Sequence, residues 1–372
     1  MSLITKQSDL NKICDSIEKA KITFIDTEFF REKTYFSILC LIQINVNGVC
    51  FAIDALEDFD FSPLVSILNN PAIIKIFHCL RQDLEVLSQS LPDKSMQEFD
   101  PKAMFDTQIM TAFCGLGFTI SYGNLVNNLL DIEVSKDWQR SDWRKRPLHP
   151  DQIAYAKIDV LHLPKIYQIL TQKLVDENKL EWAKKEMDDN VQKYLAEDDL
   201  LKNFSFSGKS AIYQKIIEAL VIWRDCLARN LDVPRSFIIK DEIVSKIAFN
   251  NPKNIGELAK CGFKTRISKS DLKSEIINLI LNQNKKLAHN PEHNSPQIAL
   301  RLSEEQKETY QKSRELLESQ AKKYQINPEL IINQANLVKL ILGSKLIENV
   351  LKDWRQDIFG EQLSKLIFTS EG

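Results

Sequence analysis

The sequence has no long apolar run. A membrane-spanning helix needs about 20 consecutive apolar residues, and none of the 372 residues belongs to a stretch of that kind. Asp9, Asp15 and Glu18 interrupt the apolar positions of the first twenty residues, a pattern that disfavours a secretory signal peptide. We therefore expect a cytoplasmic protein with no membrane span.

The sequence also lacks paired cysteines. None of its seven cysteines forms a Cys-x-x-Cys pair, and most have apolar neighbours. Structural zinc sites and disulfide frameworks both need clustered or paired cysteines. This pattern excludes a zinc cluster, makes a disulfide framework unlikely and predicts reduced, buried thiols. The cysteines stand at positions 14, 40, 50, 79, 114, 226 and 261.

A strong net charge is missing as well, because the whole chain sums to only −2. Its distribution is uneven, however. Residues 201–290 hold 16 Lys and Arg against 8 Asp and Glu, which gives +8, whereas residues 1–200 hold 22 against 31, which gives −9. We interpret this as an acidic domain followed by a basic module that tracks phosphates. The alternative is a helical domain with an ordinary charged surface.

Two carboxylates lie on one predicted strand. Residues 21–26 form a β-branched and aromatic run that leads into Asp26, which is typical of a buried strand. Side chains two apart on a strand point to the same face, so Asp26 and Glu28 should project side by side. The runs 38–45 and 49–53 predict two further strands, joined at Asn47 and Gly48 by a hairpin turn.

Two more carboxylates and a phenol follow on predicted helices. Residues 73–78 predict another strand, after which a helical pattern begins at Asp83, where a helix N-terminus favours an ionised carboxylate. Apolar residues recur at helical spacing through 152–169, and Tyr155 and Asp159 lie four apart on one face of that helix. Both side chains can therefore reach one site.

This residue set indicates a metal-dependent nuclease. Mg²⁺ and Mn²⁺ prefer oxygen ligands, and two such ions can stabilise the attacking and leaving oxygens of a phosphodiester displacement. Without cations, four clustered carboxylates would repel one another and destabilise the fold. Singly, each piece is common in globular enzymes; together they favour a catalytic site. The candidate residues are Asp26, Glu28, Asp83, Tyr155 and Asp159.

The motifs resemble a known superfamily. The stretches 24–31, 41–44, 105–109 and 138–148 are similar to those of the DEDD 3′-to-5′ exonucleases, in the subgroup with a tyrosine in the third motif, and most closely to the ribonuclease D family. That resemblance implies a ribonuclease H-like α/β domain, a mixed sheet flanked by helices. It also implies two divalent cations, Mg²⁺ or Mn²⁺, held by Asp26, Glu28, Asp83 and Asp159, with Tyr155 orienting the attacking water.

Several accessory residues have a functional and a structural interpretation. Phe29 adjoins Glu28 and could stack on a terminal base, although such residues are as often core. A basic run interleaved with tryptophans precedes the helix of Tyr155; it predicts RNA contacts, but charge runs are usually solvated faces. We expect His78 to be structural and Asp106 to cap a helix. The candidate substrate-binding residues are Phe29, Arg140, Trp143, Arg144 and Arg146.

Composition shifts divide the chain into domains. Residues 196–208 are polar and end in glycine, and 284–296 are rich in Asn, Lys, His and Pro. We expect an exonuclease domain at 1–196 and a helical domain at 208–284, which resembles the nucleic-acid-binding HRDC domain through residues 223–225, 234–241 and 251–252. A second HRDC-like domain at 296–372 has a weaker pattern, and its prediction depends mainly on the family architecture.

The resemblance implies an exoribonuclease that removes nucleoside 5′-monophosphates from RNA 3′ ends, with tRNA precursors as substrates, acting as a monomer. The 3′ polarity and the choice of RNA come from the resemblance and not from the carboxylates. Two alternatives stay open. One is a 3′-to-5′ exonuclease acting on DNA. The other is a catalytically idle RNA-binding scaffold, which the complete carboxylate set disfavours.

Overall fold

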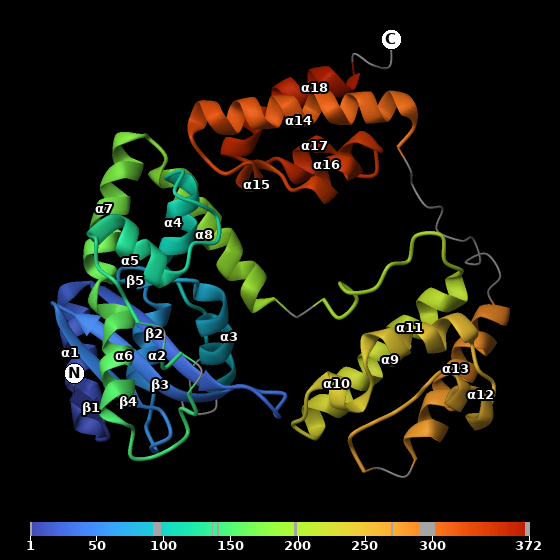
Figure 1. Ribbon diagram of the computed structural model, residues 1–372, viewed down its shortest axis with the longest axis horizontal. Coiled ribbons are helices and arrows are strands. Elements are labelled where there is room, and N and C mark those ends of the chain that lie inside the picture. Colours follow the sequence, from blue (N-terminus) through green and yellow to red (C-terminus); the bar gives the residue numbers. More distant parts are fainter. Residues whose placement is uncertain are drawn as a thin grey trace. The chain divides into compact units, whose positions relative to one another are not determined.

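The computed structural model describes residues 2–91, 98–135, 137–139, 141–196, 199–268, 271–289 and 302–368 (Figure 1). The chain divides into two units. The first unit comprises Met1–Phe30, Ile38–Ala196 and Leu302–Gly372, and the second comprises Arg31–Ser37 and Glu197–Arg301. None of the described helices is long and apolar enough to cross a membrane. All seven cysteines are free thiols, but Cys79 and Cys226 are exposed, in contrast to the expectation of buried thiols.

The first unit is built on the predicted mixed sheet. Its strand order is β1-β4-β3-β2-β5-β6. β2 pairs antiparallel with β3 and parallel with β5, and the terminal strands β1 and β6 pair parallel with β4 and β5. The strands are β1 (Ser2–Ile4), β2 (Ile22–Phe30), β3 (Ile38–Val46), β4 (Val49–Asp54), β5 (Ile74–Phe77) and β6 (Met104–Asp106).

The predicted hairpin joins β3 and β4, which pair antiparallel. Asn47 and Gly48 have φ values of 53° and 78°, the left-handed backbone that a two-residue hairpin turn requires. The sequence did not reveal β1 and β6. Each has only three residues, too few for an alternating pattern to stand out.

Helices cover both faces of the sheet. One face carries Ile25, Ile42 and Ile53, which are buried in a core together with α1 (Gln7–Ala20), α2 (Ser62–Asn69) and α3 (Leu80–Ser90). The other face contacts α6 (Pro150–Leu161), which crosses β2, β3 and β4. Around it lie α4 (Thr107–Phe113), α5 (Tyr122–Leu130), α7 (Leu163–Asp176) and α8 (Leu180–Leu195) (Figure 1).

The single helix expected over 152–169 is two helices. α6 ends at Leu161, and α7 begins at Leu163. Pro164 explains the interruption, because proline has no N–H to bond the carbonyl four residues earlier. The apolar period continues across the break, so the sequence pattern did not show it. As a result, Asp159 lies in the last turn of α6.

The second unit is helical, as predicted. Its core is formed by α9, α11 and α13 with the shorter helices between them. The predicted break at 284 falls inside α13, which continues to His289. The helices are α9 (Ala211–Asn230), α10 (Arg235–Ile238), α11 (Asp241–Asn250), α12 (Ile255–Lys260) and α13 (Leu272–His289).

The segment Arg31–Ser37 is bound into this second unit. The Tyr35 hydroxyl donates to Asp225 at 2.7 Å and accepts from Arg235 at 2.9 Å, while the Tyr35 backbone N–H donates to Asp232 at 2.9 Å. The guanidinium groups of Arg229 and Arg235 both lie 5.3 Å from the Tyr35 ring centroid. These contacts fix the segment against the end of α9 and the start of α10.

The C-terminal helices begin in the same order as the second unit, with one long helix followed by a four-residue helix and then several further helices. Ile239 and Ile332, which follow the four-residue helices, share nearly the same extended backbone, with φ values of −163° and −159°. The elements are α14 (Glu304–Tyr324), α15 (Pro328–Ile331), α16 (Gln334–Ile341), α17 (Ile347–Val350), a π-helical turn (Gln356–Gly360) and α18 (Glu361–Phe368).

These C-terminal helices pack against the sheet domain and belong to the first unit by their contacts, while the HRDC-like domain expected at 296–372 stays a prediction. The ring of Trp354 stacks on Trp182 of α8 at 5.2 Å and meets Phe113 of α4 edge-on at 5.4 Å. Arg355 pairs with Glu186 of α8. The helices therefore share one hydrophobic core with the sheet domain. Sequence composition cannot show such long-range packing.

Candidate active site

The structure brings three of the predicted carboxylates together. Asp26 and Glu28 lie two apart on β2, and Asp159 approaches the same face from the last turn of α6. One oxygen of each side chain lies within 4.8 Å of the other two, which is close enough for all three to bind one cation. The three side chains are partly buried.

The fourth carboxylate, Asp83, lies beside this group in the first turn of α3. It is 5% exposed, and the Thr27 hydroxyl donates to its Oδ1 at 2.5 Å. Its charge contributes to raising the pKa values of Glu28 and Asp159, which places it within electrostatic reach of both.

Asp106 fixes the start of the helix that carries Asp83. Its carboxylate accepts from the backbone N–H groups of Cys79 and Leu80 at 2.9 and 3.0 Å, and from Gln108 at 2.8 Å. It thus caps its own helix, as expected, and also the N-terminus of α3. His78 is also held structurally, through contacts with the Thr107 hydroxyl at 2.8 Å and a backbone carbonyl.

The burial and mutual repulsion of the four carboxylates favour the binding of a cation. Burial raises the pKa of each, and for Asp26 it does so to about 7. Repulsion among the carboxylates adds to the rise for Glu28, Asp83 and Asp159. A divalent cation removes this repulsion, and an all-oxygen donor set fits hard ions rather than zinc. The residues present therefore fit a divalent metal site.

Tyr155 lies one helical turn before Asp159 on α6. Its ring centroid is 6.2 Å from that of Trp143, at an interplanar angle of 38°. Burial, followed by the charges of Asp159, Glu28 and Asp26, raises the pKa of its phenol well above 10. In its protonated form, this phenol can donate a hydrogen bond at the carboxylate site.

Gln43 was not among the predicted residues. It is the direct partner of Asp26 on the neighbouring strand, and directly paired side chains share a face. The residue is fully buried, and both polar atoms of its amide have no hydrogen-bond partner among the described residues. A buried amide without partners is costly. The sequence did contain a signal for this residue, because a glutamine is unusual inside the apolar run 38–45.

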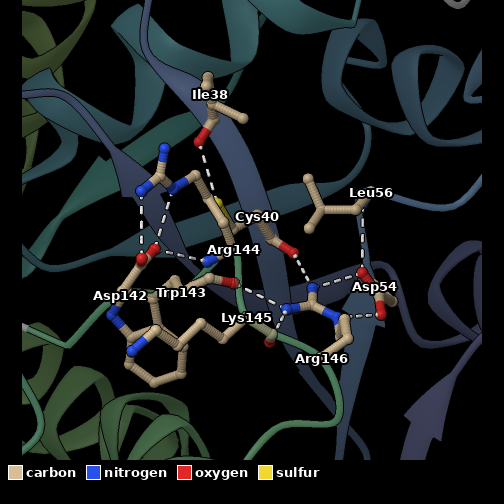
Figure 2. A network of polar contacts seen from close by, with 9 residues as sticks. All are labelled: Ile38, Cys40, Asp54, Leu56, Asp142, Trp143, Arg144, Lys145 and Arg146. Carbon is tan, nitrogen blue, oxygen red and sulfur yellow. Dashed lines mark hydrogen bonds and ion pairs between the residues drawn. The ribbon is translucent and has the colours of Figure 1, made fainter. Parts of the chain in front are cut away.

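Two of the predicted substrate-binding residues, Arg146 and Trp143, make contacts within the protein. Arg146 forms a bidentate ion pair with Asp54, both contacts at 2.5 Å, and donates to the carbonyls of Trp143 and Cys40 at 2.7 and 3.0 Å (Figure 2). Trp143 is only 2% exposed. Both residues hold the loop before α6 in place. The side chain of Arg146 is still 26% exposed, and the RNA contacts expected of the two residues stay a prediction.

Arg144 remains accessible. Its side chain is 43% exposed and pairs with Asp142 (Figure 2). It also stacks on Phe30, with 3.4 Å between the guanidinium carbon and the ring centroid. A bulge after Glu28 changes the strand register. Phe29, on the strand face opposite Glu28, packs toward α1 and α3, whereas Phe30 packs beside Tyr155. Arg140 lies outside the described residues.

Comparisons with known proteins identify the class. A family model described as a 3′-5′ exonuclease matches residues 1–175, and an HRDC domain model matches residues 214–280. The fold and the carboxylate site are therefore those of a 3′-5′ exonuclease, a class that uses divalent metal ions.

The family follows from curated relatives. The chain is 30% identical to ribonuclease D of Zymomonas mobilis over 98% of its own length and 93% of the relative's. It is 34% identical to ribonuclease D of Granulibacter bethesdensis, of which the match covers 65%. The chain belongs to the ribonuclease D family. The crystal structure of Escherichia coli RNase D, described as an exoribonuclease involved in structured RNA processing, superposes with a TM-score of 0.83, 25% identity and coverage of 99% and 98% of the two chains.

Proposed function

We propose that this protein is an exoribonuclease that hydrolyses RNA from the 3′ end and releases nucleoside 5′-monophosphates. The observation that carries the proposal is the convergence of Asp26, Glu28 and Asp159 within 4.8 Å, with Asp83 beside them. Membership of the ribonuclease D family supports the polarity and the choice of RNA.

The proposal assigns two ions, Mg²⁺ or Mn²⁺, to this site. Bound there, they would supply charge stabilisation for the attacking and leaving oxygens of the scissile phosphodiester. Asp26 would bind both ions, Glu28 and Asp159 would complete one site, and Asp83 would support the other. The Thr27 hydroxyl holds Asp83 for that role.

Tyr155 has a separate task. Its protonated phenol can orient the attacking water through a hydrogen bond, next to the carboxylates that raise its pKa. Arg144, stacked on Phe30 at the edge of this face, is the candidate contact for the RNA backbone. Guanidinium groups suit phosphates because they offer several donors in one plane.

For the RNA itself, we propose structured precursors with 3′ extensions, tRNA precursors first among them. The charge of +8 over residues 201–290 supports a role of the second unit in holding phosphates. Hydrolysis of DNA is the alternative. Comparing an RNA with a matched oligomer that carries one 2′-deoxy terminal nucleotide separates the two, because equal rates would remove the preference for RNA.

The site assignment is tested with Asp26→Asn and Tyr155→Phe on a 3′-extended RNA. The first variant should abolish hydrolysis, and the second should lower kcat by at least about 100-fold with RNA affinity unchanged. Phe249→Ala is the matched control, because Phe249 is 71% exposed in the second unit. Trimming by Asp26→Asn at the unaltered rate would refute the assignment.

A further inference from the structure

The backbone around Asp159 is held in an unusual way. Asp159 lies two residues before the end of α6, where the helical hydrogen-bond ladder is interrupted. The Val160 carbonyl would accept from the N–H four residues on, but that residue is Pro164. A carbonyl buried at such a break needs another donor.

A side chain from the sheet supplies this donor. Asn45 of β3 donates from Nδ2 to the Val160 carbonyl at 3.0 Å, and its side chain is only 1% exposed. Asn45 lies on the same strand face as Gln43, two residues away, and Gln43 is the cross-strand partner of Asp26. This bond therefore ties the end of α6 to the strand next to the one that carries Asp26.

A second side chain holds the other neighbour of Asp159. The Tyr122 hydroxyl, from the start of α5, donates to the Ile158 carbonyl at 2.7 Å. In an uninterrupted helix, the Ile158 carbonyl would accept from the N–H of His162. The Tyr122 hydroxyl instead bonds this carbonyl from outside the helix.

We propose that Asn45 and Tyr122 are positioning residues for Asp159, holding the two carbonyls that flank it from β3 and from α5. Neither side chain is assigned to the metal or to the RNA. Together they hold the backbone on both sides of Asp159, in the last turn of α6. The inference concerns the metal site and rests on the proposed function.

Loss of either hydrogen bond should weaken metal binding without affecting RNA binding. Without either bond, the last turn of α6 gains freedom, and the Asp159 carboxylate is less often at the distance from Asp26 that a shared cation requires. Loss of groups that orient a metal ligand typically lowers metal affinity or activity by about 10- to 100-fold. RNA affinity should not change, since neither residue belongs to the proposed RNA contacts.

The test uses two near-isosteric variants of the full chain, Tyr122→Phe and Asn45→Leu. Mn²⁺ binding to the metal-free protein is measured by calorimetry, and the Mg²⁺ dependence of trimming is measured at saturating RNA. Each variant should bind Mn²⁺ about 10-fold more weakly and need correspondingly more Mg²⁺. High Mg²⁺ should restore much of kcat, and the KM for RNA should stay constant.

Tyr167→Phe is the matched control. Tyr167 lies on α7 in the same core, edge-on to Phe24 and Phe105, and it contacts neither flanking carbonyl. Variants that lose only thermal stability, with Mn²⁺ affinity equal to that of the control, would overturn the inference. Should Asn45→Leu fail to fold, Tyr122→Phe alone decides. Failure of the proposed function is distinguishable, because the unaltered protein would then neither bind Mn²⁺ nor trim RNA.

Discussion

The Thr27 hydroxyl donates a hydrogen bond of 2.5 Å to the Asp83 carboxylate. Thr27 lies between Asp26 and Glu28, so its side chain points to the opposite face of β2, toward α3. The side chains of these three consecutive residues thus lie on both faces of the sheet. Two supply carboxylates to the site under α6, and the third orients the carboxylate that arrives from α3.

Thr27→Val should remove this bond while keeping the branched shape of the side chain. We expect kcat to fall about 10-fold, because one hydrogen bond to a charged group contributes roughly 1.5 kcal/mol or more. Steady-state trimming of a short RNA measures the effect. Thr27→Ser keeps the hydroxyl and should retain most activity. Equal losses in both variants would contradict a specific role of the bond to Asp83, because only Thr27→Val removes it.

The raised carboxylate pKa values predict how stability depends on pH without metal. A carboxyl whose pKa is higher in the folded than in the unfolded state stabilises the fold most below its unfolded pKa of about 4. That stabilisation is lost as the pH rises through the folded pKa, which for Asp26 is about 7. In EDTA, Tm should therefore be lower at pH 8 than at pH 6. The free energy of unfolding should fall by at most about 1.4 kcal/mol per pH unit for one group.

Magnesium should offset this loss, with a larger gain in Tm at pH 8 than at pH 6. Asp26→Asn removes one titrating group and should flatten both trends relative to the unaltered protein. Thermal unfolding monitored by circular dichroism measures all of these curves. A Tm in EDTA that rises steadily from pH 6 to pH 8 in the unaltered protein, and equally in the variant, would contradict the repulsion described for the site.

Trp354→Ala should destabilise the first unit. Trp354 is 4% exposed and packs against Trp182 and Phe113, which belong to the sheet domain. Truncating a buried tryptophan typically costs about 3–5 kcal/mol. Leu346→Ala, at a residue 59% exposed, should cost less than about 0.5 kcal/mol. If denaturant unfolding shows the same loss for both, the C-terminal helices are not part of this core.

Substitutions of Arg144 and Arg146 should have different effects, one on RNA binding and the other on the stability of the fold. Arg146→Met leaves the buried Asp54 without its partner and should cost about 3 kcal/mol or more. Arg144→Ala removes an exposed ion pair and the stacking on Phe30, so stability should change by less than about 2 kcal/mol. RNA affinity should nevertheless fall and become less dependent on salt. Unchanged affinity in Arg144→Ala would exclude this residue from the RNA contacts.

Local patterns predicted much of the structure. The alternation of β2, the Asn47–Gly48 turn and the spacing of Tyr155 and Asp159 all depend on neighbouring residues, and each produced the expected element. The joining of Asp26, Glu28 and Asp159 at one point followed from the family resemblance, because the sequence alone does not state which elements meet.

Long-range and geometric features could not be predicted in this way. Whether Arg146 faces RNA or Asp54 depends on a contact 92 positions away in the chain. The packing of Trp354 on α8 similarly arises from a tertiary contact, so the sequence did not show that the C-terminal helices share a core with the sheet domain.

The most direct test is to incubate the protein with a 3′-extended tRNA precursor labelled at its 5′ end, in Mg²⁺, in Mn²⁺ and in EDTA, with Asp159→Asn as a parallel sample. The account predicts a ladder that shortens stepwise from the 3′ end with either metal and is absent in EDTA and in the variant. Internal cuts, or shortening that persists in EDTA, would contradict it.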